Sequence, residues 1–373
     1  MSTILLSGYY GYQNIGDEAV LGGMLAGLRE ELPEFTPVVL SGNPEDTRLM
    51  HDVAAIPRMN PGAILAALKD SALLISGGGS LLQDVTSRHS PLYYLGVLWL
   101  AQRAGIPTMM LAQGVGPLSH PLNRRLARCI LNKTRAITVR DATSAALLTE
   151  LGVNKPPIEV TADMSFLLQA DHSARLDAWW AEHVPADRPV LAVALRRWTQ
   201  GTSSERYTAI TDALEAFAAE NHAFILFLPM QYEHDLPVAE EMAGWTHAES
   251  RVLNLPVTPR EMMSVVGRCS FILAMRLHAL IFAVQHATPA LGLAYDPKVL
   301  DFSRLADLPT PLPWGEITAD ALLSALRRQW EQRDTVHANM AKTRERLITL
   351  AQRNIGCIKE LLVAEGGRMK AEG

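Results

Sequence analysis

The sequence has little cysteine and none of the motifs that mark common metal or hydrolase sites. Among 373 residues there are three cysteines, Cys129, Cys269 and Cys357, and no Cys-x-x-Cys pair. Widely spaced single cysteines argue against a zinc ribbon or a disulfide scaffold and favour a reducing compartment. His-Glu-x-x-His, Gly-x-Ser-x-Gly, a Walker A loop and clustered carboxylates are also absent. Metalloprotease, serine hydrolase and P-loop chemistry are therefore unsupported, and we expect no metal and no organic cofactor.

Long apolar runs and a strong net charge are missing as well. No apolar run reaches the roughly 18 residues that a spanning helix needs, and the first residues lack the basic and apolar regions of a secretory signal. We therefore expect a cytoplasmic protein. The net charge of −5 gives no reason to expect nucleic-acid binding. Residues 321–373 carry ten Lys/Arg against six Asp/Glu, which could favour an anionic membrane surface, but the solvated face of a helix is the simpler interpretation.

What the sequence does contain is a repeated alternation of short apolar segments with helical patterns. In the first half the apolar segments are TILLSG, TPVVLSG, ALLISGG, TMMLAQG, AITVRD and IEVTAD. After a polar stretch at residues 169–189 the alternation restarts with PVLAVALRR, AFILFLPM, SRVLNL, SFILAM and ALGLAY. Continuous apolar strands separated by helices predict parallel sheets that helices cover on both faces.

Two such halves followed by a helical tract predict a GT-B-like α/β fold: two doubly wound Rossmann-type domains, a cleft between them and a long C-terminal helix. We place the N-terminal domain at residues 1–168, a linker at 169–188, the C-terminal domain at 189–317 and the helical tract at 318–373. Ligands of such sheets bind outside the carboxyl ends of the strands. The residues that follow each strand are therefore the ones that carry chemistry.

Glycine-rich loops follow three strands of the first domain, in GYYGYQNIGDE, SGGGSLLQD and AQGVGP. Gly8, Gly11 and Gly16 do not have the Gly-x-Gly-x-x-Gly spacing of a dinucleotide site, and the second strand ends in Ser-Gly rather than an acid. Asp17 and Glu18 then begin a helix. Acids in a first helical turn complement the helix dipole, and we prefer that role for Glu18. Asp17 could instead act as a general base or bind a substrate hydroxyl.

The segment QDVTSRHSPLYY adds Arg88, His89 and two aromatic residues. Polar groups flanked by aromatic rings suit a sugar, because the faces of a sugar stack and its edges form hydrogen bonds. For His89 alone, a solvated loop position is the simpler interpretation.

The second domain contains the most informative segment, FILAMRLHALIF, in which an apolar strand turns directly into Arg276, Leu277 and His278. Guanidinium binds phosphate or carboxylate through two hydrogen bonds, and imidazole can transfer a proton near neutral pH. A structural salt bridge for Arg276 and a core position for His278 are the alternative. We prefer a bound anion because an unpaired cation in apolar surroundings is costly. In ALRRW, Arg196 and Arg197 end another strand, and strand alternation leaves only one of them facing a ligand.

Seven segments together resemble the polysaccharide pyruvyl transferase family, specifically its bacterial cell-wall branch that serves S-layer anchoring. They are SGYYGYQNIGDEAVL, ISGGGSLLQDVTSRHSPLYYL, LAQGVGPL, TVRDATS, ADMSF, AMRLHALIFA and YDPKV. The resemblance implies a GT-B-like fold and transfer of a pyruvyl unit from phosphoenolpyruvate to two hydroxyls of one sugar, with release of phosphate. The acceptor that it implies is N-acetylmannosamine on a lipid-pyrophosphate-linked disaccharide, modified at O4 and O6. Such an acceptor would bring the enzyme to the inner face of the membrane.

The resemblance also implies that Arg276, Leu277 and His278 bind phosphoenolpyruvate, assisted by an arginine from the first strand of that domain, for which we favour Arg196 over Arg197. The chemistry then needs a general acid, which we assign to His278, and a base, which we assign to Asp17, while Arg276 stabilises the departing phosphate. On the acceptor side the residues that we expect are Tyr10, Asn14, Asp17, Gln83, Arg88 and Gln113. Two alternatives stay open: a nucleotide-sugar glycosyltransferase, for which Asp296 is the ribose-binding candidate, and a non-catalytic sugar- or anion-binding regulator.

Overall fold

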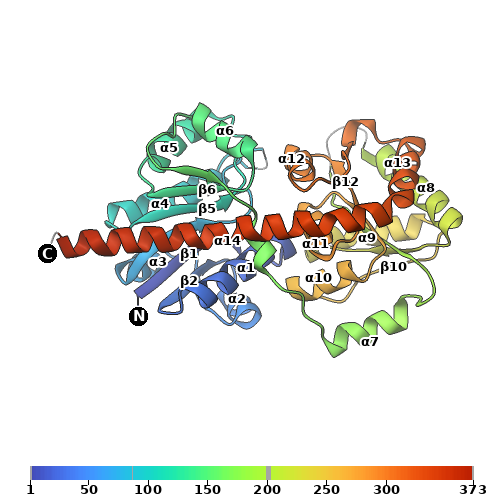
Figure 1. Ribbon diagram of the computed structural model, residues 1–373, viewed down its shortest axis with the longest axis horizontal. Coiled ribbons are helices and arrows are strands. Elements are labelled where there is room, and N and C mark those ends of the chain that lie inside the picture. The colour runs from blue at the N-terminus through green and yellow to red at the C-terminus, as the bar shows by residue number, and fades with distance from the viewer. Residues whose placement is uncertain (1, 86, 199–202, 372–373) are drawn as a thin grey trace. The chain divides into compact units, whose positions relative to one another are not determined.

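The computed structural model describes residues 2–85, 87–198 and 203–371, which form two units, each around its own sheet (Figure 1). Unit 1 comprises Met1–Gln13, Asp17–Leu168 and Leu347–Gly373, and unit 2 comprises Asn14–Gly16 and Gln169–Arg346. The prediction of two parallel-sheet α/β halves followed by a long C-terminal helix is confirmed.

Unit 1 is built on a seven-stranded sheet with the order β3-β2-β1-β4-β5-β6-β7, in which the pairings are parallel. The strands are β1 (Ser2–Tyr10), β2 (Phe35–Ser41), β3 (Ala54–Pro57), β4 (Ser71–Gly77), β5 (Thr108–Gln113), β6 (Ala136–Val139) and β7 (Ile158–Val160). The helices between them are α1 (Ile15–Glu31), α2 (Pro44–His51), α3 (Pro61–Lys69), α4 (Ser90–Arg103), α5 (Pro121–Leu131) and α6 (Ala142–Glu150).

Helices cover both faces of this sheet. On one face α3, α4, α5 and α6 contribute Leu68, Leu98, Leu131 and Leu148 to one apolar core. On the other face α1 packs together with the later part of α14 (Arg333–Ala371) over a second core. All six residues of β5 are buried, as expected for a parallel strand that is covered on both sides.

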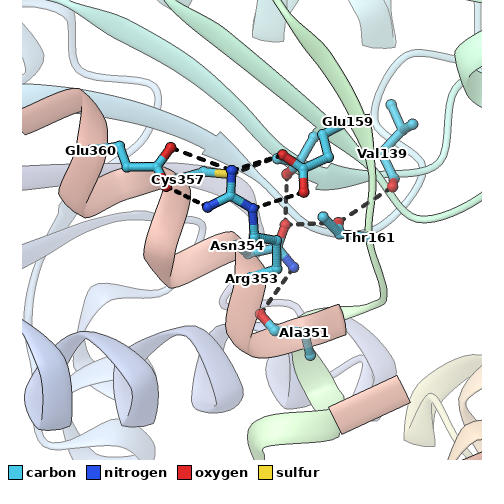
Figure 2. Close-up of polar contacts among 9 residues, drawn as sticks. Val139, Glu159, Thr161, Ala351, Arg353, Asn354, Cys357 and Glu360 are labelled. Atoms are coloured by element: carbon cyan, nitrogen blue, oxygen red, sulfur yellow. Dashed lines mark hydrogen bonds and ion pairs between the residues drawn. The ribbon is translucent and has the colours of Figure 1, made fainter. Parts of the chain in front are cut away.

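A polar network fixes the later part of α14 to unit 1 (Figure 2). Asn354 is fully buried, and its Oδ1 accepts hydrogen bonds from Thr138 Oγ1 at 2.7 Å and from Thr161 Oγ1 at 2.8 Å. Its Nδ2 donates to backbone carbonyls. Arg353 donates to both carboxylate oxygens of Glu159, at 2.8 and 3.1 Å. Because the buried amide is paired at both ends, this polar group can lie inside the core.

Unit 2 is built on a six-stranded parallel sheet with the order β10-β9-β8-β11-β12-β13. The strands are β8 (Val190–Ala194), β9 (Phe224–Phe227), β10 (Ser250–Val252), β11 (Phe271–Ala274), β12 (Ala290–Ala294) and β13 (Leu312–Pro313). The helices are α7 (Ala174–His183), α8 (Ser203–Asn221), α9 (Tyr232–Trp245), α10 (Pro259–Gly267), α11 (Leu277–His286), α12 (Pro297–Leu305) and α13 (Ala319–Glu331), followed by the first part of α14. At the start of α10, Thr258 and Glu261 form a capping box.

The opening loop contributes residues to both units. The backbone N–H of Ile15 donates to the carbonyl of Met230 at 2.9 Å, and Asn14 forms an isolated antiparallel bridge with Gln231. Asn14–Gly16 therefore belongs to unit 2, although the strand before it and the rest of α1 belong to unit 1. Within the described ranges, none of the helices combines the length and apolarity that crossing a membrane would require.

Candidate functional site

In unit 2, three neighbouring strands place polar side chains at one edge of the sheet. Ala274 of β11 pairs with Ala194 of β8 and with Gly292 of β12. Because the three strands are parallel and in this register, their carboxyl ends lie side by side. The residues that follow are Arg196 after β8, Arg276 after β11 and Tyr295 after β12. This edge is where an α/β sheet binds its ligands.

Three cations surround Tyr295. Arg196 Nη1 donates to the Tyr295 hydroxyl at 3.4 Å, and the guanidinium carbon lies 5.4 Å from the ring centroid. Lys298 Nζ lies 5.5 Å from the same centroid. Burial acts to raise the pKa of the Tyr295 hydroxyl, but the charges of Lys298, Arg196 and Arg276 outweigh burial, and the pKa is lowered. We call Arg196, Arg276, Tyr295 and Lys298 the Tyr295 cluster.

Arg276 has a carboxylate partner within the chain. Its Nε donates to Asp235 Oδ2 at 2.8 Å, and one terminal nitrogen donates to Asp235 Oδ1. Asp235 also accepts from the backbone N–H groups of Met230 and Gln231, at 3.1 and 2.9 Å. The side chains of Arg276 and Asp235 are 12% and 1% exposed. The structural salt bridge that we kept as the alternative for Arg276 is therefore present, because Asp235 provides the countercharge.

The cluster keeps a net positive charge nevertheless. Lys298 pairs with Asp296 at 3.2 Å, and the Arg276 ion pair leaves Nη1 outside the pair. Among the described residues no carboxylate pairs with Arg196, and its buried Nε has no hydrogen-bond partner there. Three cations therefore face two carboxylates, an arrangement that suits a small anion.

The structure separates Arg196 from its neighbour Arg197. Arg197 forms an ion pair with Glu241, and the two side chains are 51% and 36% exposed. Arg196 joins the Tyr295 cluster instead. Adjacent residues at a strand end point in opposite directions, so only Arg196 lies with the other cations.

His278 lies against the opening loop. It is the second residue of α11, whose N-cap is Arg276. A Cβ at Gly16 would lie 2.1 Å from His278 Nδ1, so only glycine permits this approach. Asn14 Oδ1 accepts from the Gly16 N–H at 3.1 Å and holds the loop in place. Leu277, between Arg276 and His278, is buried and serves the core.

In unit 1, Asp17 lies against the glycine-rich loop that follows β4. Gly79 there has a φ of +63°, and a Cβ at this residue would lie 2.5 Å from Asp17 Oδ1. The backbone of the loop therefore approaches the carboxylate as closely as glycine allows. Glu18, the next residue, is 2% exposed, and its carboxylate accepts from Gly11 N at 2.8 Å and contacts His51 Nε2 at 2.9 Å. Glu18 thus has a specific structural role in shaping the opening loop.

Other expected acceptor residues lie in different surroundings. The Tyr10 hydroxyl donates to the Gly77 carbonyl at 2.7 Å, and burial raises the pKa of Tyr10 well above its usual value. Gln113 is fully buried and donates to the Ser76 carbonyl at 2.8 Å. A role for these two in acceptor binding stays a prediction, but both side chains lie inside unit 1.

The last two expected acceptor residues, Gln83 and Arg88, are at least partly accessible to solvent. Gln83 is half-buried, and its Oε1 accepts from the Val85 N–H at 3.0 Å. Arg88 is exposed.

Arg58, which was not predicted from the sequence, is buried beneath the opening loop. Its Nη1 donates to the Gly8 carbonyl at 3.1 Å, and its guanidinium carbon lies 4.1 Å from the Tyr93 ring, 5.2 Å from the Tyr94 ring and 5.6 Å from the Tyr12 ring. Cation–π contacts of this kind stabilise a buried guanidinium. A single arginine after a four-residue strand gives no signal in the sequence.

Arg140 is a second buried arginine to which we gave no role, although it lies in the TVRDATS segment. It donates to Asp163 Oδ2 at 3.0 Å and to Ser80 Oγ at 2.9 Å. It thereby joins the ends of β6 and β7 to the glycine-rich loop after β4. In the described part of the chain, no group of three or more His, Cys, Asp or Glu side chains is placed to hold a metal ion.

Comparisons with known proteins agree with this description. UDP-GlcNAc 2-epimerase from Neisseria meningitidis superposes with a TM-score of 0.65 at 11% identity, covering 97% of this chain and 100% of that one. HepE from Anabaena, solved with UDP and glucose, superposes with a TM-score of 0.64 at 11% identity, covering 98% and 100%. These likenesses show the GT-B-like fold.

Two sequence comparisons concern the family itself. Amylovoran biosynthesis protein AmsJ of Erwinia amylovora is 20% identical over 366 residues, covering 82% of this chain and 86% of the relative. The profile of the polysaccharide pyruvyl transferase family matches residues 14–297. Because this match spans more than half of the chain, the protein belongs to the polysaccharide pyruvyl transferase family and is a transferase with a saccharide acceptor.

Proposed function

We propose that this transferase forms a 4,6-linked pyruvate ketal on a cell-wall sugar, with phosphoenolpyruvate as the donor and phosphate as the second product. The acceptor that we propose is N-acetylmannosamine of a lipid-pyrophosphate-linked disaccharide, in the branch that serves S-layer anchoring, at the cytoplasmic face of the membrane. The family match supports pyruvyl transfer, and the relative named for amylovoran biosynthesis supports a polymer-forming pathway.

The Tyr295 cluster is the observation that carries the donor assignment. Phosphoenolpyruvate has a carboxylate and a phosphate, and the cluster holds three cations against two carboxylates. We assign the main donor contact to Arg196, because it has no carboxylate partner among the described residues. Arg276 would add Nη1, and Lys298 would add a mobile point charge. We assign the donor to unit 2, and the acceptor to unit 1 together with Asn14 of the opening loop.

The reaction needs one proton delivered and two removed. As the first sugar hydroxyl attacks C2 of the donor, its proton passes to Asp17 and the methylene C3 takes a proton from His278 to become a methyl group. The second hydroxyl then attacks C2 and passes its proton to His278, which became deprotonated when it protonated C3, while the C–O bond to phosphate breaks and phosphate leaves. Arg196 and Arg276 would stabilise the charge that develops on phosphate.

On the acceptor side we propose that Asp17 is the base and that Asn14, Gln83 and Arg88 form hydrogen bonds with the sugar. Asn14 lies in the same loop as Gly16, which packs against His278. Tyr10 and Gln113 would act indirectly, because they support β1 and β5 from inside the unit.

A titration separates this proposal from the rival functions. We expect calorimetry to show binding of phosphoenolpyruvate and not of UDP-sugars, and phosphate release when an acceptor analogue is added. Binding of UDP-sugars but not of phosphoenolpyruvate would support the glycosyltransferase alternative. A structure of similar fold, HepE, was solved with UDP and glucose. Binding of phosphoenolpyruvate without phosphate release would support a non-catalytic regulator.

A further inference from the structure

Charge is distributed unevenly along the chain. Residues 59–133 contain seven Lys/Arg and two Asp/Glu, a local net charge of +5 in a chain whose total is −5, so the remaining residues carry −10. This segment builds α3, α4 and α5, which cover one face of the unit 1 sheet. The segment that builds these three helices is therefore basic in an otherwise acidic protein.

The same segment exposes large apolar side chains. Among the described residues ten such side chains are exposed, and half of them fall here: Met59, Leu65, Val85, Trp99 and Leu122. On α4, Gly96, Trp99 and Arg103 are all exposed at helical spacing, which places them on one outward stripe. On α5, Leu122, Arg125 and Arg128 form a similar stripe, and α4 packs against α5. We call these two stripes the α4–α5 surface.

We propose that the α4–α5 surface docks the enzyme onto an anionic lipid bilayer. Tryptophan favours the membrane–water interface, and each basic side chain near an anionic leaflet strengthens binding. Among the described residues, Arg103, Arg125 and Arg128 form no ion pair, so their charges are available to lipid headgroups. A second copy of the chain fits this surface poorly, because a symmetric contact would bring cations against cations.

The basic C-terminal tract fits this role less well. Among the described residues, several of its cations are balanced within their own unit: Arg327 pairs with Glu220 and Arg346 with Asp307 in unit 2, and Arg353 pairs with Glu159 in unit 1. The inference deepens the proposed function, since a lipid-linked acceptor lies at a membrane, but the binding that it predicts does not require catalysis.

Sedimentation of the full chain with vesicles tests the proposal. We expect binding to phosphatidylcholine vesicles that contain phosphatidylglycerol, weak binding to phosphatidylcholine alone, and loss of binding at high salt. Arg103→Gln with Arg125→Gln should lower the partition coefficient about 25-fold, because each cation contributes about fivefold. Trp99→Ala should lower it several-fold. Circular dichroism and phosphate release with a soluble acceptor analogue confirm that each variant is folded and active.

Matched controls lie outside the surface. Trp245→Ala removes another exposed tryptophan, and Lys342→Gln with Arg344→Gln removes two exposed cations of α14; neither should change vesicle binding. Equal sedimentation with both kinds of vesicle would overturn the proposal. So would wild-type binding by either α4–α5 variant, or a loss confined to the α14 control. If the wild-type protein binds the vesicles but releases no phosphate, the result counts against the proposed function and not against the membrane-docking proposal.

Discussion

Arg276 and Asp235, 41 residues apart, form an ion pair through two hydrogen bonds at the edge of the unit 2 sheet. The pair joins the start of α11 to the first turn of α9, where Asp235 also accepts two backbone hydrogen bonds. Arg276 is therefore held in place before any ligand binds. Preorganised charge of this kind stabilises a developing anion without reorganisation during the reaction.

Replacing Asp235 with Asn should destabilise the protein strongly. The substitution keeps the shape but leaves a nearly buried guanidinium without its countercharge, and breaking such a pair costs about 3–5 kcal/mol of unfolding free energy. Denaturant unfolding measures the loss. Glu241→Gln, which breaks the exposed pair with Arg197, should cost less than about 1 kcal/mol. Equal losses in the two variants would show that the buried pair does not stabilise unit 2.

Arg196→Gln should weaken the donor site without unfolding the protein. Loss of a charge-assisted hydrogen bond to phosphoenolpyruvate should raise its KM about 10- to 100-fold, measured by phosphate release. Arg197→Gln should leave KM unchanged, since Arg197 faces Glu241. A larger effect from Arg197 than from Arg196 would reverse the assignment.

His278→Gln should reduce turnover strongly and weaken donor binding only a few-fold. Loss of a general acid lowers kcat about 10²- to 10⁴-fold, while calorimetry should give a Kd for phosphoenolpyruvate within a few-fold of wild type. His234→Gln changes an exposed histidine of α9 and serves as the control. Wild-type turnover in His278→Gln would end the general-acid assignment.

Gly16→Ala should impair turnover through His278. The added methyl group would lie 2.1 Å from Nδ1, so either the imidazole or the loop must move. Gly96→Ala is the matched substitution, because a Cβ there meets nothing within 4 Å. In the exposed face of α4 it should add about 0.5–1 kcal/mol of stability through helix propensity. Comparable kcat values in the two variants would argue that the position of His278 is not critical.

Tyr295 should ionise at lower pH than an ordinary tyrosine. Its pKa is lowered in the folded state. At a pH between this lowered pKa and the usual value of about 10, Tyr295 is therefore protonated in the unfolded chain and ionised in the folded protein. The contribution of Tyr295 to stability is therefore complete above the unfolded pKa and is lost as pH falls through the folded pKa. Phenolate absorbance should show one early step that Tyr295→Phe removes and Lys298→Gln shifts upward.

Buried tyrosines of unit 1 provide the contrast in the same titration. Burial raises the pKa of Tyr94 to about 12, so this residue should remain protonated long after Tyr295 has ionised. An early step that persists unchanged in Tyr295→Phe would mean that the cluster does not lower this pKa.

Several elements followed from local patterns. The apolar runs predicted the central strands of both sheets. The segment after β11 predicted that Arg276 and His278 open α11. These features depend on neighbours two to four residues apart, and a linear sequence displays such spacing directly.

The sequence by itself thus determined two parallel α/β halves, a helical tail and an arginine–histidine pair at a strand end. Only the tertiary structure decided that Asp235 neutralises Arg276, that Arg196 rather than Arg197 joins Tyr295, and that Tyr10 is buried. It also decided that Asn14–Gly16 belongs to unit 2. Each of these depends on which strands are neighbours and in what register, and long-range pairing of that kind leaves no periodicity in the chain.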